Sequence, residues 1–244
     1  MDNEEVRPAF YAARQGTVSD WWTLLHPPYT AWHLSYVLIG AGLAPHIDLR
    51  RLAATLVAFF LAVGISAHAL DELNGRPLKT RIGDKGLWIA SVVGLLGAIS
   101  LGALGAIQVS VWLLAFIPAG AFLVLAYNLE WFDGLFHSDF VFAAAWGSFP
   151  VLTAAFAQKG YVTFAEALAA VAAFGLSAAQ RTLSTPARSM RRQVIRFEAT
   201  VTTADGSRAF SRQDLIEPLE RALRILSWTV LALGLSLVTS KVMR

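Results

Sequence analysis

The chain has 244 residues, of which 56% are hydrophobic and 15% are charged. Soluble domains carry about 25% charged residues, so this composition predicts a polytopic membrane protein. The absence of cysteine excludes disulfides, iron–sulfur clusters and thiolate zinc sites. The net charge of +3 requires no nucleic-acid partner, because attraction to anionic lipid headgroups accounts for it.

Seven apolar segments predict an all-α bundle of about seven transmembrane helices. Residues 1–28 are mixed polar and aromatic, which predicts a cytoplasmic or interfacial segment and no cleavable signal. The rest of the chain is predicted to form a transmembrane bundle over 29–181, a basic cytoplasmic connector over 182–221 and a final transmembrane helix over 222–244. The predicted spans are 29–45, 52–70, 86–107, 109–128, 140–158, 163–181 and 222–240. The third and fourth are separated only near Gln108, which predicts a tight helical hairpin.

Lys and Arg are distributed unequally between the two predicted sides of the membrane. One side holds the N-terminus and the segments 71–85, 129–139 and 182–221, and with Arg181 and Arg224 at the adjoining helix ends it carries fifteen of the 20 basic residues. The positive-inside rule makes this side cytoplasmic, in an inner or plasma membrane. Within the connector, residues 194–211 alternate weakly around Ala204-Asp205-Gly206, which predicts a hairpin. Ser211 and Asp214 then predict the N-cap of the last helix.

Ionisable residues are costly inside a membrane, so their positions predict a functional pocket. The topology places several of them at the cytoplasmic ends of the helices, where His68 and Glu72 share a face at i,i+4. Glu130, Asp133 and His137 would share a face if their helix continued past Glu130, a continuation that Gly134 disfavours. The residues expected to converge are His33, His68, Asp71, Glu72, Glu130 and His137.

Two kinds of chemistry are compatible with this set. Imidazoles and carboxylates on helix pairs are ligands for iron, manganese or zinc, and the predicted ligands are His33, His68, Glu72, Glu130 and His137. Carboxylates alone suit magnesium that holds a phosphate. Basic residues near the pocket, Arg76, Lys79, Arg81, Arg181 and Arg188, are candidates for binding a diphosphate or lipid phosphate. The stretch Trp146-Gly147-Ser148-Phe149-Pro150 predicts a kinked packing site.

The arrangement resembles the UbiA-type intramembrane prenyltransferase superfamily over about residues 20–185. The local match is the acidic end of span 2 followed by NGRPL at 74–78, which is similar to the Arg-Pro-Leu after that family's first aspartate-rich motif. The resemblance implies a helical bundle with a cytoplasm-facing pocket, in which magnesium and a prenyl diphosphate are held for transfer to an aromatic or lipid acceptor. The chain departs from the family at the second motif, where QRTLS stands at 180–184, and His68 occupies the region of the first.

The leading hypothesis is a metal-dependent membrane enzyme that acts on a lipid or isoprenoid. For prenyl transfer, Asp71, Glu72 and Glu130 are the expected catalytic residues holding magnesium-diphosphate, and Arg76 and Arg181 assist its departure. A redox or hydrolytic site would instead use the histidines to bind iron, manganese or zinc. The alternative is a non-enzymatic subunit or a lipid-, pigment- or haem-binding protein, as a homo-oligomer or within a larger membrane complex. An ion-coupled transporter ranks last, because spans 3 and 7 offer few polar residues.

Overall fold

The fold is a bundle of helices with one small β-hairpin, seen in a computed structural model that describes residues 7–14 and 16–243. The helices and strands are α1 (Thr17–Leu24), α2 (Pro27–Gly42), α3 (Leu49–Phe59), η1 (Phe60–Ala67), α4 (His68–Leu73), α5 (Asp84–Gln108), α6 (Leu113–Asn128), α7 (Asp139–Ala143), η2 (Ala144–Ser148), α8 (Phe149–Lys159), α9 (Phe164–Arg192), β1 (Ala199–Thr203), β2 (Gly206–Phe210) and α10 (Arg212–Val242). The segments α3–η1–α4 and α7–η2–α8 are each continuous, and η1 and η2 are π-helical.

Each of the seven predicted spans overlaps one helical stretch of the described chain, but α9 continues to Arg192, past the predicted end at 181, and α10 begins at Arg212, before the predicted start at 222. Four stretches are long and apolar enough to cross a membrane: Leu49–Leu73, Asp84–Gln108, Asp139–Lys159 and Arg212–Val242. The apolar helix α6 is shorter, at 16 residues. The predicted hairpin near Gln108 is confirmed, because α5 ends there and α6 begins at Leu113. The chain is an integral membrane protein with an all-helical bundle.

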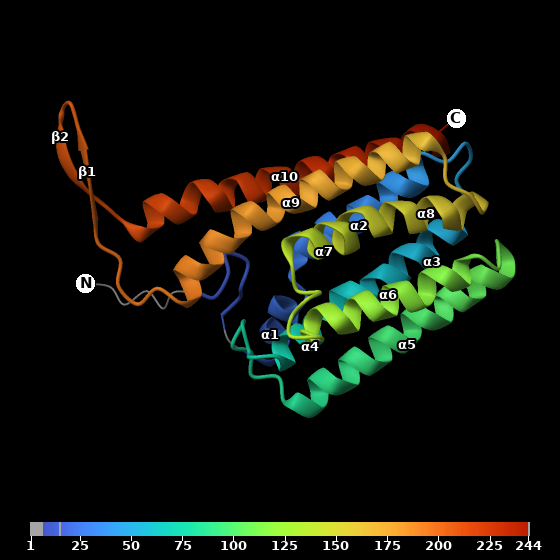
Figure 1. Ribbon diagram of the computed structural model, residues 1–244, viewed down its shortest axis with the longest axis horizontal. Coiled ribbons are helices and arrows are strands. Elements are labelled where there is room, and N and C mark those ends of the chain that lie inside the picture. The colour runs from blue at the N-terminus through green and yellow to red at the C-terminus, as the bar shows by residue number, and fades with distance from the viewer. Residues whose placement is uncertain (1–6, 15, 244) are drawn as a thin grey trace.

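The helices form two sides of the bundle in Figure 1. On one side α9 and α10 lie next to each other and cover α2 and α8, and on the other side α3, α5 and α6 pack together. We call the end with α1, the 74–83 loop and the β-hairpin the hairpin end, and the end with the loops 43–48, 109–112 and 160–163 the far end. The basic segments of the sequence therefore gather at the hairpin end.

Local sequence signals explain most helix boundaries. The Asp48 carboxylate accepts hydrogen bonds from the backbone N–H groups of Arg50 and Arg51 and caps α3. A capping box formed by Thr163 and Glu166 begins α9. The predicted cap of the last helix is also confirmed, since Ser211 and Asp214 form a capping box at α10. The predicted hairpin is found as β1 and β2, which pair antiparallel from Ala199–Phe210 to Thr203–Gly206.

The interior is held by close helix–helix contact around two large buried rings. Trp32 donates its indole N–H to the hydroxyl of Tyr36 at 2.6 Å, which satisfies a buried polar atom inside α2. Gly40 of α2 lies directly against the backbone of Val151 in α8. Small residues of this kind allow two helix backbones to approach closely, as is typical of membrane bundles.

Helix α6 ends too early to place Glu130 and His137 on one helical face. It stops at Asn128, and Glu130, Phe132 and Asp133 have positive φ angles of 51°, 56° and 55°. This left-handed backbone cannot continue a right-handed helix. The shared helical face of Glu130 and His137 is therefore absent, and the loop sets their positions.

Candidate functional site at the hairpin end

Glu72 is buried and fully engaged in holding the 74–83 loop. Its side chain is 0% exposed and accepts hydrogen bonds from the N–H groups of Leu78 and Thr80 at 2.9 and 2.8 Å. The Thr80 hydroxyl donates a third bond at 2.9 Å. Three protein donors take the place of water around the Glu72 carboxylate, so its role in the structure is to fix the loop.

Asp71, the neighbouring acid, has the opposite environment. Its carboxylate makes no hydrogen bond or ion pair with any residue that the structure describes, although it is partly buried. The charges of Arg188, Arg192 and His137 act on it, and Arg188 is the strongest of these. The Arg188 guanidinium also has no hydrogen-bond partner among residues 7–14 and 16–243. Asp71 and Arg188 are thus an unengaged acid and base at the same end of the bundle.

Carbonyl oxygens of the two π-helices fix His68 and His33 in the tautomer that is protonated at Nδ1. His68 Nδ1 lies 3.2 Å from the carbonyl oxygen of Gly64 in η1, and His33 Nδ1 lies 3.1 Å from that of Trp146 in η2. A carbonyl oxygen only accepts, so each Nδ1 carries the proton and each Nε2 keeps its lone pair. His33 is 4% exposed, and its Nε2 has no hydrogen-bond partner among the residues that the structure describes. The stretch around Trp146, predicted as a kinked packing site, overlaps the π-helix η2.

The N-terminal segment covers the site. The Tyr11 hydroxyl and His26 Nδ1 are hydrogen-bonded at 2.9 Å, and the His26 ring stacks on His68 with centroids 4.2 Å apart. Arg192 donates from Nε to the carbonyl oxygen of Pro8 at 3.1 Å. Sequence reasoning missed Tyr11, whose only signal is an aromatic residue in the polar segment before the first span.

Arg181 lies on the edge of this site, near a second aromatic group. Its guanidinium donates to Asp139 at 2.8 Å and to the hydroxyl of Tyr127 at 2.7 Å. Tyr127 stacks on His137, with centroids 4.4 Å apart, and contacts Trp146 at 4.5 Å. The expected placement of Arg181 near the polar pocket is therefore compatible with the structure, but its charge already has a carboxylate partner.

The remaining predicted residues lie at the margin. Glu130 has a side chain that is 53% exposed and is 3.8 Å from His137 Nδ1, which also faces the Tyr127 carbonyl oxygen at 3.1 Å. The Arg76 guanidinium binds Asp84 and donates to the carbonyl oxygen of Ile82 at 2.6 Å. Arg76 thus stabilises the 74–83 loop through hydrogen bonds to its C-terminal part, as Glu72 also does.

The predicted five-residue metal set does not form one centre. No group of three or more His, Asp or Glu side chains within the described ranges is placed to hold a metal ion. The candidate ligand atoms are already engaged or displaced. Both Glu72 carboxylate oxygens accept hydrogen bonds from the loop, and the Nδ1 atoms of His33 and His68 face backbone carbonyl oxygens. Glu130 lies in the left-handed turn after α6. The five residues predicted to bind iron, manganese or zinc therefore do not fit one site for such a metal, as they are arranged here.

We expect His26 to make the stability of the protein depend on pH. Burial, reinforced by the charges of His68, Arg192 and Arg188, holds its pKa well below the ordinary value. A histidine with a lowered pKa in the folded state must gain a proton on acidification, so stability is present above the unfolded pKa of about 6.5 and is lost as pH falls below it. We expect the melting temperature to fall between pH 7.5 and pH 5, and H26Q to reduce this slope.

The matched control for that measurement is H46Q, because His46 is exposed at the far end. Scanning both variants and the wild type by intrinsic tryptophan fluorescence gives the three slopes. An unchanged slope in H26Q, or an equal reduction in H46Q, would contradict the role of His26.

Comparison with solved structures places the fold in a known class. The chain aligns with a UbiA homolog from Archaeoglobus fulgidus, solved bound to Cd²⁺, with a TM-score of 0.52 and 15% sequence identity. The alignment covers 92% of this chain and 86% of that one. No protein-family model and no curated protein sequence matches the chain. The predicted UbiA-like fold is therefore confirmed, and at this identity the likeness establishes the fold alone.

Proposed function

We propose that this protein is an intramembrane enzyme that acts on an isoprenoid or other lipid with an anionic head group, at the hairpin end. The observation that carries this proposal is the unengaged pair of Asp71 and Arg188. An unpartnered arginine and an unpartnered carboxylate at the end of a membrane bundle are costly unless a ligand uses them. The UbiA-like fold supports a prenyltransferase-like activity.

In the proposed mechanism the arginines take the place of metal in binding the head group. Arg188 and Arg192 act on the same region, and guanidinium groups bind phosphate oxygens in pairs. Their positive charge would stabilise a departing diphosphate as negative charge develops on it. Asp71 would accept the proton of the attacking group on the acceptor, because its carboxylate has no competing donor.

The apolar part of the substrate would lie deeper in the bundle. Trp146 separates the polar site from the bundle interior, since it contacts Tyr127 on one side and lines an apolar cavity on the other. The ring of Phe59, 5.4 Å from the His33 ring, lines the same cavity. A prenyl chain that passes Trp146 would meet mainly aromatic and aliphatic side chains, because the charged and amide lining residues Arg50, Arg51 and Gln108 lie at the far end.

The test compares binding of a prenyl diphosphate, monophosphate and alcohol of equal chain length to the purified protein. We expect the diphosphate to bind most tightly and R188Q to weaken it by about tenfold, because one charge-assisted contact is lost. Incubation with membrane lipids as acceptors should show prenyl transfer that D71N reduces by about a hundredfold. The control R196Q changes an exposed arginine of the connector and should leave diphosphate binding and prenyl transfer unchanged.

Equal binding of all three prenyl compounds, or full activity of D71N, would overturn the proposal. The second candidate is a non-enzymatic lipid carrier, which the apolar cavity favours. It predicts that lipid copurifies in stoichiometric amount and that no acceptor is prenylated.

A further inference from the structure

We propose a second lipid site, which takes one hydrocarbon chain of an acidic phospholipid into the bundle from the far end and holds its phosphate at Arg50. The polar mouth of this site is at the opposite end of the helices from the proposed reaction, and its hydrocarbon chain and the prenyl chain would occupy the same cavity in alternation. It rests on an apolar cavity, on a cation at its mouth and on the apolar surface around that mouth.

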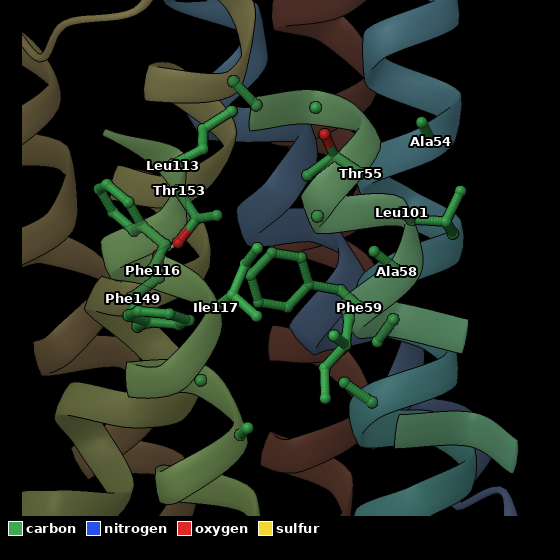
Figure 2. Close-up of a pocket in the computed structure, with 18 of the residues that line it drawn as sticks. Ala54, Thr55, Ala58, Phe59, Leu101, Leu113, Phe116, Ile117, Phe149 and Thr153 are labelled. Carbon is green, nitrogen blue, oxygen red and sulfur yellow. Dashed lines mark hydrogen bonds between the residues drawn. The ribbon is translucent and has the colours of Figure 1, made fainter. Parts of the chain in front are cut away.

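The cavity lies between α3, α5, α6 and α8 and has a volume of about 430 Å³. Figure 2 shows the rings of Phe59, Phe116 and Phe149 and the side chain of Ile117 around its interior. Along α6 its wall extends from Leu113 to Val124, which corresponds to about 17 Å at 1.5 Å per residue. This length suits an extended hydrocarbon chain.

The walls offer no free polar group along most of that length. The hydroxyls of Thr55 and Thr153 both donate to their own helices, to the carbonyl oxygens of Arg51 and Phe149, at 2.7 Å each. An apolar cavity without free hydrogen-bonding groups holds water poorly and holds hydrocarbon well. The occupant inside must therefore be apolar.

All charged lining residues lie at the far end. Arg51 is engaged, since it donates to the Gln158 carbonyl oxygen at 2.7 Å and pairs with Asp48 at 3.5 Å. Arg50 is exposed, and its guanidinium makes no hydrogen bond or ion pair in the part of the chain that the structure describes, although the exposed Asp48 carboxylate is near enough for the two charges to interact. A free guanidinium above an apolar cavity matches an acidic lipid, with the phosphate outside and the chain inside.

The surface around the mouth indicates that it lies at the membrane interface. Ile107, Val111 and Trp112, in and beside the α5–α6 turn, are 83%, 65% and 70% exposed. Tryptophan is enriched at the level of lipid headgroups, and a charged side chain near a helix end reaches that level. Arg50 is thus in position to meet a phosphate without leaving the interface.

The test measures lipid binding to the full chain by native mass spectrometry, with phosphatidylglycerol and phosphatidylcholine of the same acyl chains as probes. We expect phosphatidylglycerol to bind preferentially and R50Q to lower its affinity by about tenfold toward that of phosphatidylcholine. The control K241Q removes a basic residue from α10 that is outside the cavity lining, and it should have no effect. A58F fills the cavity from α3 and should abolish binding of both lipids.

Equal binding of the two lipids, or unchanged binding by R50Q, would overturn the role of Arg50. Undiminished binding by a folded A58F would overturn the cavity as the chain site. If A58F does not fold, R50Q still decides the proposal, because Arg50 is exposed. Binding of prenyl diphosphate should be unchanged in R50Q, so failure here is distinguishable from failure of the proposed reaction.

Discussion

Replacing Gly40 with alanine should lower the melting temperature by about 10 °C or prevent accumulation of the protein. A Cβ at this position would lie 2.9 Å from the carbonyl carbon of Val151 and still closer to its oxygen. Backbone atoms cannot rotate away as a side chain can, so α2 and α8 would have to separate. Overpacking of this kind costs about 3 kcal/mol, and about 3 °C is lost per kcal/mol in a chain of this size.

The matched control for G40A is G175A. A Cβ at Gly175 in α9 would meet no atom of the described residues within 4 Å, and the residue is exposed. This substitution should leave stability unchanged or raise it by about 0.5 kcal/mol, because alanine loses less backbone entropy in a helix. Equal melting temperatures for the two variants would show that the contact between α2 and α8 is not as close as the structure has it.

Replacing Glu72 with alanine should destabilise the protein by about 4 kcal/mol. The change leaves the N–H groups of Leu78 and Thr80 and the Thr80 hydroxyl without their acceptor, and each unsatisfied buried group costs about 1–3 kcal/mol. We expect faster proteolysis within residues 74–83 and a lower melting temperature. The amide in E72Q keeps one acceptor oxygen and should cost about half as much.

The control for E72A is the adjacent substitution D71A. Asp71 makes no hydrogen bond or ion pair with the described residues, so D71A should change stability by less than about 1 kcal/mol. The prediction also separates a structural acid from a metal ligand, since a chelator should leave the melting temperature of the wild type unchanged if Glu72 only holds the loop. A chelator-sensitive wild type with a stable E72A would reverse this assignment.

The sequence by itself determined the class of protein and the order of its elements. Long apolar runs are a local signal, so most helix ends were predictable to within a few residues, but the polar extensions of α9 to Arg192 and of α10 from Arg212 were not. The same applies to the Ser211–Asp214 cap and to the hairpin around Asp205, whose chemistry depends on neighbours in sequence. The UbiA-like fold was also predictable, because the order of spans and the NGRPL segment carry it.

Only the tertiary structure decided what each ionisable group does. Asp71 and Glu72 are adjacent in sequence and look equivalent as ligands, yet one is free and the other accepts three hydrogen bonds. Helical spacing predicts which residues share a face, but it does not predict which donors a returning loop brings to that face. The apolar cavity beneath Arg50 has the same origin, since it is a gap between four helices and belongs to no segment of the sequence.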